Sequence, residues 1–311
     1  MKQLQVFACL IFAHSLSATT LVYNLKIRRV FSGLSMLLEK RDKALWIATA
    51  VPISYTRKTH FVNKRFLTDL HDKRSGFGSV FNLRYVPTPA WWLEATTAVQ
   101  KETSKTTGTS TEYACRSAFD DVVISGGYNS FLSERTQLSW YGLAGFPTTT
   151  DVSLVERNER LVGTRFFAVG GGFEGSYSFI MSQQKTLVGI LQLRAIHFFT
   201  REWETLFGPG SKIQPGQTID LLLSLRYRYG FTSFEAGYNP TFFIHQALLL
   251  PTETIDTPTT VRQGGYANLM HLTSFTLNNH PVAVGTGFLV NTVKRLEARS
   301  FSWWVNVTII F

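Results

Sequence analysis

The segment TIDLLLSLRYR, residues 218–228, decides the fold because its two sets of alternate positions differ in polarity. All five odd-numbered positions are apolar, whereas the even-numbered positions include Asp220, Arg226 and Arg228. A period of two places these two sets on opposite faces of a β-strand. One uninterrupted apolar face and one charged face are typical of a strand whose two sides meet lipid and water.

The same alternation recurs along most of the chain. Twelve segments show it, beginning near residues 44, 76, 90, 119, 137, 165, 186, 218, 231, 265, 281 and 300. The mean hydropathy of +0.02 is too low for a helical membrane bundle. With 17% charged and 14% aromatic residues, the chain also does not have the composition of a disordered protein. The sequence therefore predicts an all-β fold, a transmembrane antiparallel up-and-down β-barrel of about twelve strands.

Charged residues provide a test of this fold. In eleven of the twelve strands the apolar face carries no charge at bilayer depth, and only the strand near residues 265–277 has two mixed faces. A charge on the lipid face of a barrel costs about 2–4 kcal/mol at the midplane, whereas a lumen position tolerates it. A soluble β-sandwich would carry its charges on its outer faces. The charges predicted to face the lumen are Arg84, Glu94, Asp121, Glu174, Arg194, Asp220, Arg226, Arg228 and Glu235.

The connections between the segments alternate in length. Short ones lie near residues 87–89, 133–136, 182–185, 229–230 and 278–280. Long ones lie near 58–74, 101–116, 147–163, 199–216 and 246–264, before a short final one near 295–299. Outer-membrane barrels have short periplasmic turns and longer outer loops. An even strand number predicts that both termini are periplasmic. Aromatic residues expected to form girdles at the strand ends are Tyr85, Trp91, Tyr128, Trp140, Tyr227 and Trp303.

The last twelve residues, SFSWWVNVTIIF at 300–311, resemble the terminal strand of Gram-negative outer-membrane proteins. This resemblance implies an assembly signal, read by the barrel-assembly machinery and formed by Trp303, Val305, Val307, Ile309 and Phe311. Residues 121–128 and 138–149 are similar in style to meta-pathway phenol-degradation transporters and fatty-acid channels. The resemblance implies a porin-like transport barrel in the bacterial outer membrane.

The N-terminus predicts export. An apolar run over residues 6–13 and small residues up to Ala18 indicate a signal peptide over residues 1–18. A membrane anchor is the alternative, but eight apolar residues do not span a bilayer. Residues 19–43 are basic and fit a periplasmic extension, a plug or an additional strand. The barrel is expected over residues 44–311.

Two residue patterns in the chain could in principle support chemistry. Gly170–Gly175 has GxGxxG spacing, but the alternation continues beyond it, so a dinucleotide site is excluded. An enzyme in the barrel wall is the rival class, yet none of the histidines has an obvious serine partner at matching depth. We expect no catalytic site, no metal and no cofactor. For an exported barrel, the net charge of +10 indicates contact with outer-membrane lipid or solvated loops rather than a nucleic-acid partner.

The predicted lumen charges suggest a function. Hairpin geometry places Arg226 opposite Glu235 and Glu174 opposite Arg194, with Asp220 on the strand next to Arg194. Such a mixed-sign cluster either fills a narrow interior or forms a constriction that selects solutes. The expected function is passage of small, possibly hydrophobic, solutes through a narrow lumen. The alternative is a closed structural barrel whose outer loops bind a partner, and the sequence leaves the oligomeric state open.

Overall fold

The computed structural model describes residues 44–63, 68–107, 111–119, 121–147, 166–202, 209–257, 259–293 and 298–310. The predicted signal peptide over residues 1–18, the basic segment over residues 19–43 and Phe311 lie outside these ranges. No helix in the described part of the chain is long and apolar enough to cross a membrane.

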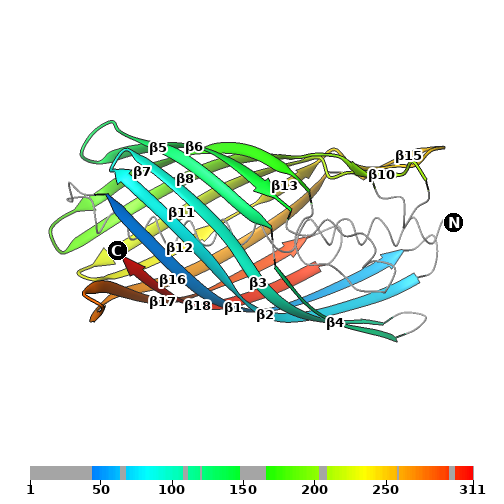
Figure 1. Cartoon of the computed structure of the whole chain (residues 1–311), viewed down its shortest axis with the longest axis horizontal. Helices are drawn as coiled ribbons and strands as arrows, with labels where there is room; N and C mark the ends of the chain where they lie inside the picture. Colours follow the sequence, from blue (N-terminus) through cyan, green and yellow to red (C-terminus); the bar gives the residue numbers. More distant parts are fainter. Residues whose placement is uncertain are drawn as a thin grey trace.

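Fourteen strand segments form one closed antiparallel sheet (Figure 1). They are β1 Leu45–Asn63, β2 Thr68–Thr88, β3 Trp91–Thr107, β4 Thr111–Phe119, β5 Val122–Phe131, β6 Thr136–Phe146, β7 Ala168–Met181, β8 Lys185–Phe198, β11 Gln217–Tyr229, β12 Thr232–Tyr238, β13 Thr241–Ile244, β16 Thr260–Leu277, β17 His280–Val293 and β18 Ala298–Ile310. Because β4 and β5 share one position in the wall, as do β12 and β13, the barrel has twelve strand positions. The predicted all-β, twelve-stranded, up-and-down barrel is confirmed.

The first and last strands close the wall. β1 pairs antiparallel with β18 from Ile47↔Ile310 to Lys58↔Arg299. Thr49 Oγ1 donates a hydrogen bond to Thr308 Oγ1 across this seam at 3.2 Å. The turns between β2 and β3, β5 and β6, β7 and β8, β11 and β12, and β16 and β17 lie at one end of the barrel, which we call the turn end and which is on the left in Figure 1. At the turn between β16 and β17, Asn278 and Asn279 have φ of 50° and 67°, as a two-residue hairpin turn requires.

The two faces of the wall show the burial expected of a membrane barrel. Along β11, Leu223 and Leu225 are 49% and 55% exposed on the outer face, while Ser224 and Arg226 are buried on the inner face. Large apolar side chains are exposed over the outer surface on every side of the barrel. An outer surface of this kind is stable when lipid rather than water surrounds it.

Two predicted loops are wrong. Residues 58–74 and 101–116 belong largely to hairpins, because β1 and β2 pair as far as Asn63↔Thr68, and β3 and β4 as far as Thr107↔Thr111. Residues 101–116 are rich in threonine, which favours strands, and in both segments the ladder satisfies the backbone groups beyond the apolar band. Their polar composition is therefore that of strands extended into water.

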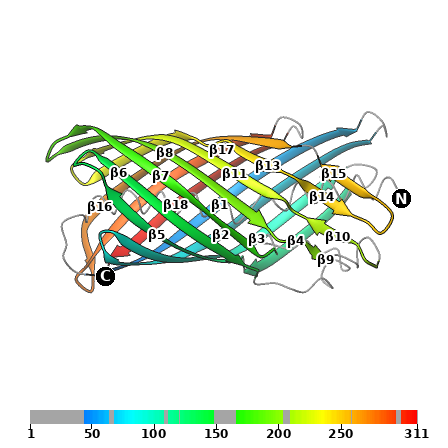
Figure 2. The same cartoon turned by 90° about the horizontal axis from the view of Figure 1, so that it is seen from above.

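The predicted loops at 199–216 and 246–264 also contain strands. A second sheet joins β9 Arg201–Glu202, β10 Lys212–Gln214, β14 Gln246–Leu249 and β15 Thr254–Thr257 in the order β9–β10–β14–β15. This order repeats that of β8, β11, β13 and β16, so the small sheet continues four wall strands beyond a break (Figure 2). At the break, Gly216 and His245 have φ of 74° and 55°. Ile213 and Leu248 of the small sheet join one buried cluster with Phe166 and with the inward-facing Phe198 of β8.

The structure of β16 explains why the strand near residues 265–277 shows two mixed faces in the sequence. Tyr266, Asn268 and Met270 are buried on the inner face, so two large residues of the apolar set point inward. The ladder between β16 and β17 then shifts between Leu272 and Thr276. This irregularity leaves residues 273–275 outside the regular pairing, which interrupts the alternation in the sequence.

Candidate functional site

The inner face of the barrel collects the charges of the wall. All nine residues predicted to face the lumen occupy inward positions: Glu174 and Arg228 are half-buried, and the other seven are buried. The fold produces this placement because an outward position would put each charge against lipid. Within this set the structure brings three groups together.

The first group, which we call the loop-side row, crosses four strand positions in register. Arg194 on β8 faces Asp220 on β11, Asp220 faces Thr241 on β13, and Thr241 faces Arg262 on β16. Arg194 donates from Nε and Nη2 to Asp220 Oδ2 at 3.1 and 2.8 Å. Thr241 Oγ1 donates to Asp220 Oδ1 at 2.6 Å and accepts from Arg262 Nη2 at 2.9 Å. The row is thus one continuous hydrogen-bonded chain along the inner wall.

The second group, the turn-side cluster, lies six residues further along β11, or about 20 Å. Arg226 donates from Nε and Nη2 to Glu235 Oε2 at 2.8 and 2.7 Å. Tyr266 on β16 donates its hydroxyl to Glu235 Oε1. Register pairs Arg226 with Glu235, so the predicted facing of these two residues is confirmed.

The predicted facing of Glu174 and Arg194 is wrong. The ladder between β7 and β8 places Gln192 opposite Glu174 and Gly172 opposite Arg194. The register shifts between Ser178 and Ile180, so one extra residue enters β7 close to the turn. Sequence spacing alone does not reveal such a bulge.

Two predicted residues form a third group near the turn end. Arg84 on β2 faces Glu94 on β3, and the Arg84 Cζ atom lies 4.7 Å from the centroid of the Trp92 ring. Cation–π contacts of this kind stabilise a buried guanidinium. Asp121 is buried just before β5, and Arg228 lies near the end of β11.

Three members of these groups were not predicted from the sequence. Arg262 stood in a predicted loop, Tyr266 stood in the unassigned strand, and Thr241 follows the break at Asn239–Pro240. The available signal was the alternation of Thr241 and Phe243, which are buried, with Phe242 and Ile244, which are less so. Their position beside Asp220 depends on how β13 and β16 pair with β11, and the sequence does not reveal that register.

The opposite side of the lumen is more apolar, although it holds the Arg84–Glu94 group. Its buried inward residues come mainly from β1, β2, β3, β17 and β18 and form one cluster that includes Leu45, Ile47, Val51, Ile53, Val80, Ala98, Ala283, Leu289 and Trp304. The charged groups lie largely on β8, β11, β12, β13 and β16. Five arginines and five acids make up the charged set once Arg262 is added, so these ten residues together are neutral.

Three histidines lie at or near the ends of wall strands. His271 Nδ1 shares a hydrogen bond with Thr232 Oγ1 at 2.9 Å. His197 stacks edge-on against Phe199 with ring centroids 5.3 Å apart on the outer face, and His245 sits at the strand break. These contacts position the rings in the wall and its rim.

Comparison with known proteins identifies the fold. No protein-family model and no curated protein matches the chain. Among solved structures, the COG4313 outer membrane channel from Pseudomonas putida F1 is similar with a TM-score of 0.64 and 14% identity, over 88% of this chain and 97% of that one. The transport unit of the autotransporter AIDA-I from Escherichia coli is similar with a TM-score of 0.52 and 9% identity, over 88% and 92% of the two chains. At these identities the likeness shows the fold, which is that of outer-membrane β-barrels.

Proposed function

We propose that this outer-membrane-type barrel is a channel for small solutes whose narrowest part lies at the loop-side row and the turn-side cluster. The observation that carries the proposal is the loop-side row, in which four side chains on four adjacent strand positions line one level of the inner wall. The similar structure described as an outer membrane channel supports this function.

The energetics of buried charge favour a functional reading of these groups. A buried ion pair gains little net stability over well-packed apolar residues of the same volume. The apolar side of the lumen shows that the same wall accommodates inward Leu, Ile and Val. The buried charges that the inner wall retains are therefore better explained by solute selection than by filling alone.

The two sides together indicate the solute class. A solute with an apolar body can pass along the side of Ile47 and Val51, while its polar groups face the arginine–carboxylate pairs. Because the charged set is balanced, we expect weak selection by net charge. Small, moderately hydrophobic solutes fit such a lumen.

The location of the protein follows from the same proposal. An outer face of exposed apolar side chains places the wall in a bilayer, and the turn end faces the periplasm by analogy with outer-membrane barrels. Trp303, Val305 and Val307 are exposed on the outer face of β18, where the assembly machinery would read them before the wall closes. Cleavage after residue 18 belongs to this proposal as well.

A closed barrel with a surface-recognition role is the second candidate. The small sheet favours it, because Ile213 and Leu248 pack against inward-facing residues at the loop end and so cover part of the mouth. The paired extensions of β1–β2 and β3–β4 also offer rigid surfaces beyond the apolar band.

Single-channel recording in a planar bilayer tests the proposal. We expect discrete conductance steps from the refolded mature chain, and a shift towards anion selectivity in Asp220→Asn, because that change leaves Arg194 and Arg262 unbalanced. Asp256→Asn in the exposed β15 is the matched control and should leave selectivity unchanged. A silent bilayer, with folding shown by heat-modifiable gel mobility, would overturn the channel and favour the surface-recognition barrel.

A further inference from the structure

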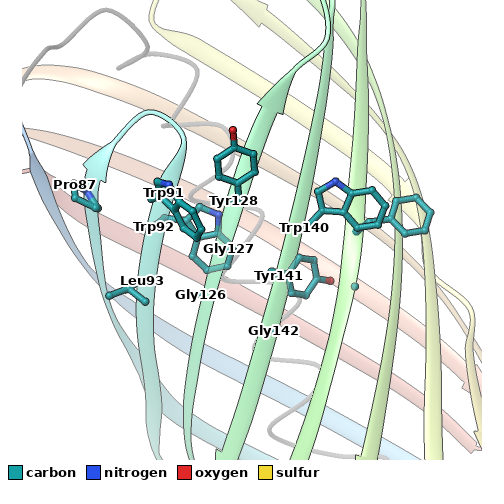
Figure 3. A pocket seen from close by; sticks show the side chains of 12 residues that line it. Pro87, Trp91, Trp92, Leu93, Gly126, Gly127, Tyr128, Trp140, Tyr141 and Gly142 are labelled. Atoms are coloured by element: carbon teal, nitrogen blue, oxygen red, sulfur yellow. The ribbon is translucent and has the colours of Figure 1, made fainter.

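The outer wall carries a hollow of about 880 Å³ near the turn end, on β3, β5, β6 and β7 (Figure 3). Its upper border is a row of four aromatic residues in register, Trp91, Tyr128, Trp140 and Phe173. Ring centroids are 4.9 Å apart for Trp91–Tyr128 and 5.6 Å apart for Trp140–Phe173. These side chains form a ridge across the wall.

The next outward row, two residues further along each strand, has almost no side chains. It runs from Leu93 through Gly126 and Gly142 to Gly171, again in register. The row after it is aliphatic, with Ala95, Ile124, Ala144 and Val169. The glycine row is thus a groove between an aromatic and an aliphatic ridge. It is about 7 Å wide and spans two strand spacings of about 4.8 Å, from β5 to β7, with the Leu93 side chain at its β3 end.

The glycines of the wall differ in how much space a side chain would find there. On the inner face, a Cβ on Gly127 would meet the Trp92 ring at 2.5 Å, and one on Gly172 would meet the Tyr141 hydroxyl oxygen at 2.8 Å. Packing of the wall therefore requires both. On the outer face, a Cβ on Gly126 would meet Leu93 Cδ2 and one on Gly171 would meet the Tyr141 carbonyl oxygen, each at 2.8 Å, whereas a Cβ on Gly142 would meet only the Gly170 carbonyl oxygen, at 3.9 Å. Glycine weakens a strand, and the wall would accept a larger residue at this position.

We propose that this groove binds one acyl chain of a phospholipid from the leaflet at the turn end. The aromatic ridge lies where a girdle meets the head groups, so the groove begins just inside the hydrocarbon layer. Its lining is apolar and continuous with the lipid-facing wall, and its width matches a single hydrocarbon chain. The proposal rests on the membrane-facing wall and does not depend on the channel function.

The test fills the groove without disturbing the wall. Gly142→Leu places a side chain in the groove at the position where the barrel leaves room. Gly265→Leu is the matched control, because Gly265 is outward on β16 and a Cβ there would meet only the Gly237 carbonyl oxygen, at 4.0 Å. Both variants are made in the full chain and refolded in detergent micelles doped with palmitoyl-oleoyl phosphatidylethanolamine.

Native mass spectrometry then counts retained phospholipid on each barrel. We expect one bound phospholipid on the wild type and on Gly265→Leu, and at least a tenfold lower occupancy on Gly142→Leu. Equal occupancy of all three, or none on the wild type, would overturn the proposal. A change in oligomeric state of Gly142→Leu without lipid loss would assign the groove to a contact between copies. Reduced channel conductance with lipid retained would assign it to the solute path, and either result overturns lipid binding.

Discussion

The two sides of the lumen follow the same strand alternation but differ in chemistry. On β1, β2 and β18 many inward residues are apolar, as at Ile47 and Val80, and Arg84 is a buried charge among them, whereas on β8, β11 and β16 the inward residues include several buried arginines and acids. The outer faces of all these strands are alike, since lipid demands apolar residues everywhere. The outer face therefore reflects the lipid around the barrel, whereas the inner face carries the residues that are specific to the function of this protein.

Breaking the turn-side cluster should have the largest effect on stability. Arg226→Met leaves the Glu235 carboxylate buried without its guanidinium, which costs about 3–5 kcal/mol. The double variant Arg226→Met/Glu235→Leu should recover most of this loss, because no buried charge remains. Urea unfolding of the refolded barrels in liposomes measures both. A double variant as unstable as the single one would show that the pair stabilises the barrel by more than the neutralisation of each other's buried charge.

A truncation on the apolar side should cost somewhat less. Ile47 is 1% exposed within the apolar cluster, so Ile47→Ala should destabilise the barrel by about 2–4 kcal/mol through lost contacts and a cavity. Leu83→Ala on the outer face of β2 is the control, because Leu83 is 46% exposed and lipid can refill the space. If both variants unfold at the same urea concentration, the inner cluster is not a packed core.

Removing a single hydroxyl from the loop-side row should have a smaller effect. Thr241→Val deletes the group that joins Asp220 to Arg262, at a cost of about 1–3 kcal/mol. Thr241→Ser, which keeps the hydroxyl, should restore most of the stability in the same unfolding assay. Equal losses for valine and serine would attribute the effect to packing of the methyl group instead.

The smallest effect is expected outside the lumen. Lys212 Nζ and Glu202 Oε1 are 3.6 Å apart in the small sheet, with side chains 47% and 69% exposed. Lys212→Gln should change stability by less than about 0.5 kcal/mol, since water and salt screen such pairs. A larger loss would mean that the small sheet supports the wall below it.

Sequence patterning predicted the wall well, for a physical reason. Residues such as Leu223 and Arg226 must go to opposite faces in lipid, so the inward and outward sets are visible without a structure. Register is set by turns and bulges that leave little trace in polarity. Arg226–Glu235 lies next to a short turn and could be predicted, whereas the turn between β7 and β8 and the bulge in β7 together place Gln192 rather than Arg194 opposite Glu174.

The loop end was the least predictable region. The stretch rich in Lys and Arg in the β1–β2 hairpin has the composition of a loop, yet its backbone continues the ladder. The small sheet depends on breaks at Gly216 and His245, and only the glycine suggests a turn in the sequence. For the same reason Arg262, beyond that break, could not be joined to Asp220 in advance.

The seam between β1 and β18 has a consequence for the timing of folding. Thr49 and Thr308, hydrogen-bonded across it, are 259 residues apart in the chain, so the closing contacts are among the most non-local possible. Closure must therefore wait until the last strand is present, and forming it is slow because the loop entropy is paid first. Until then β1 keeps an unpaired edge that invites aggregation. Pairing of β18 with β1 therefore determines when the barrel loses the exposed edge at which it can misassemble.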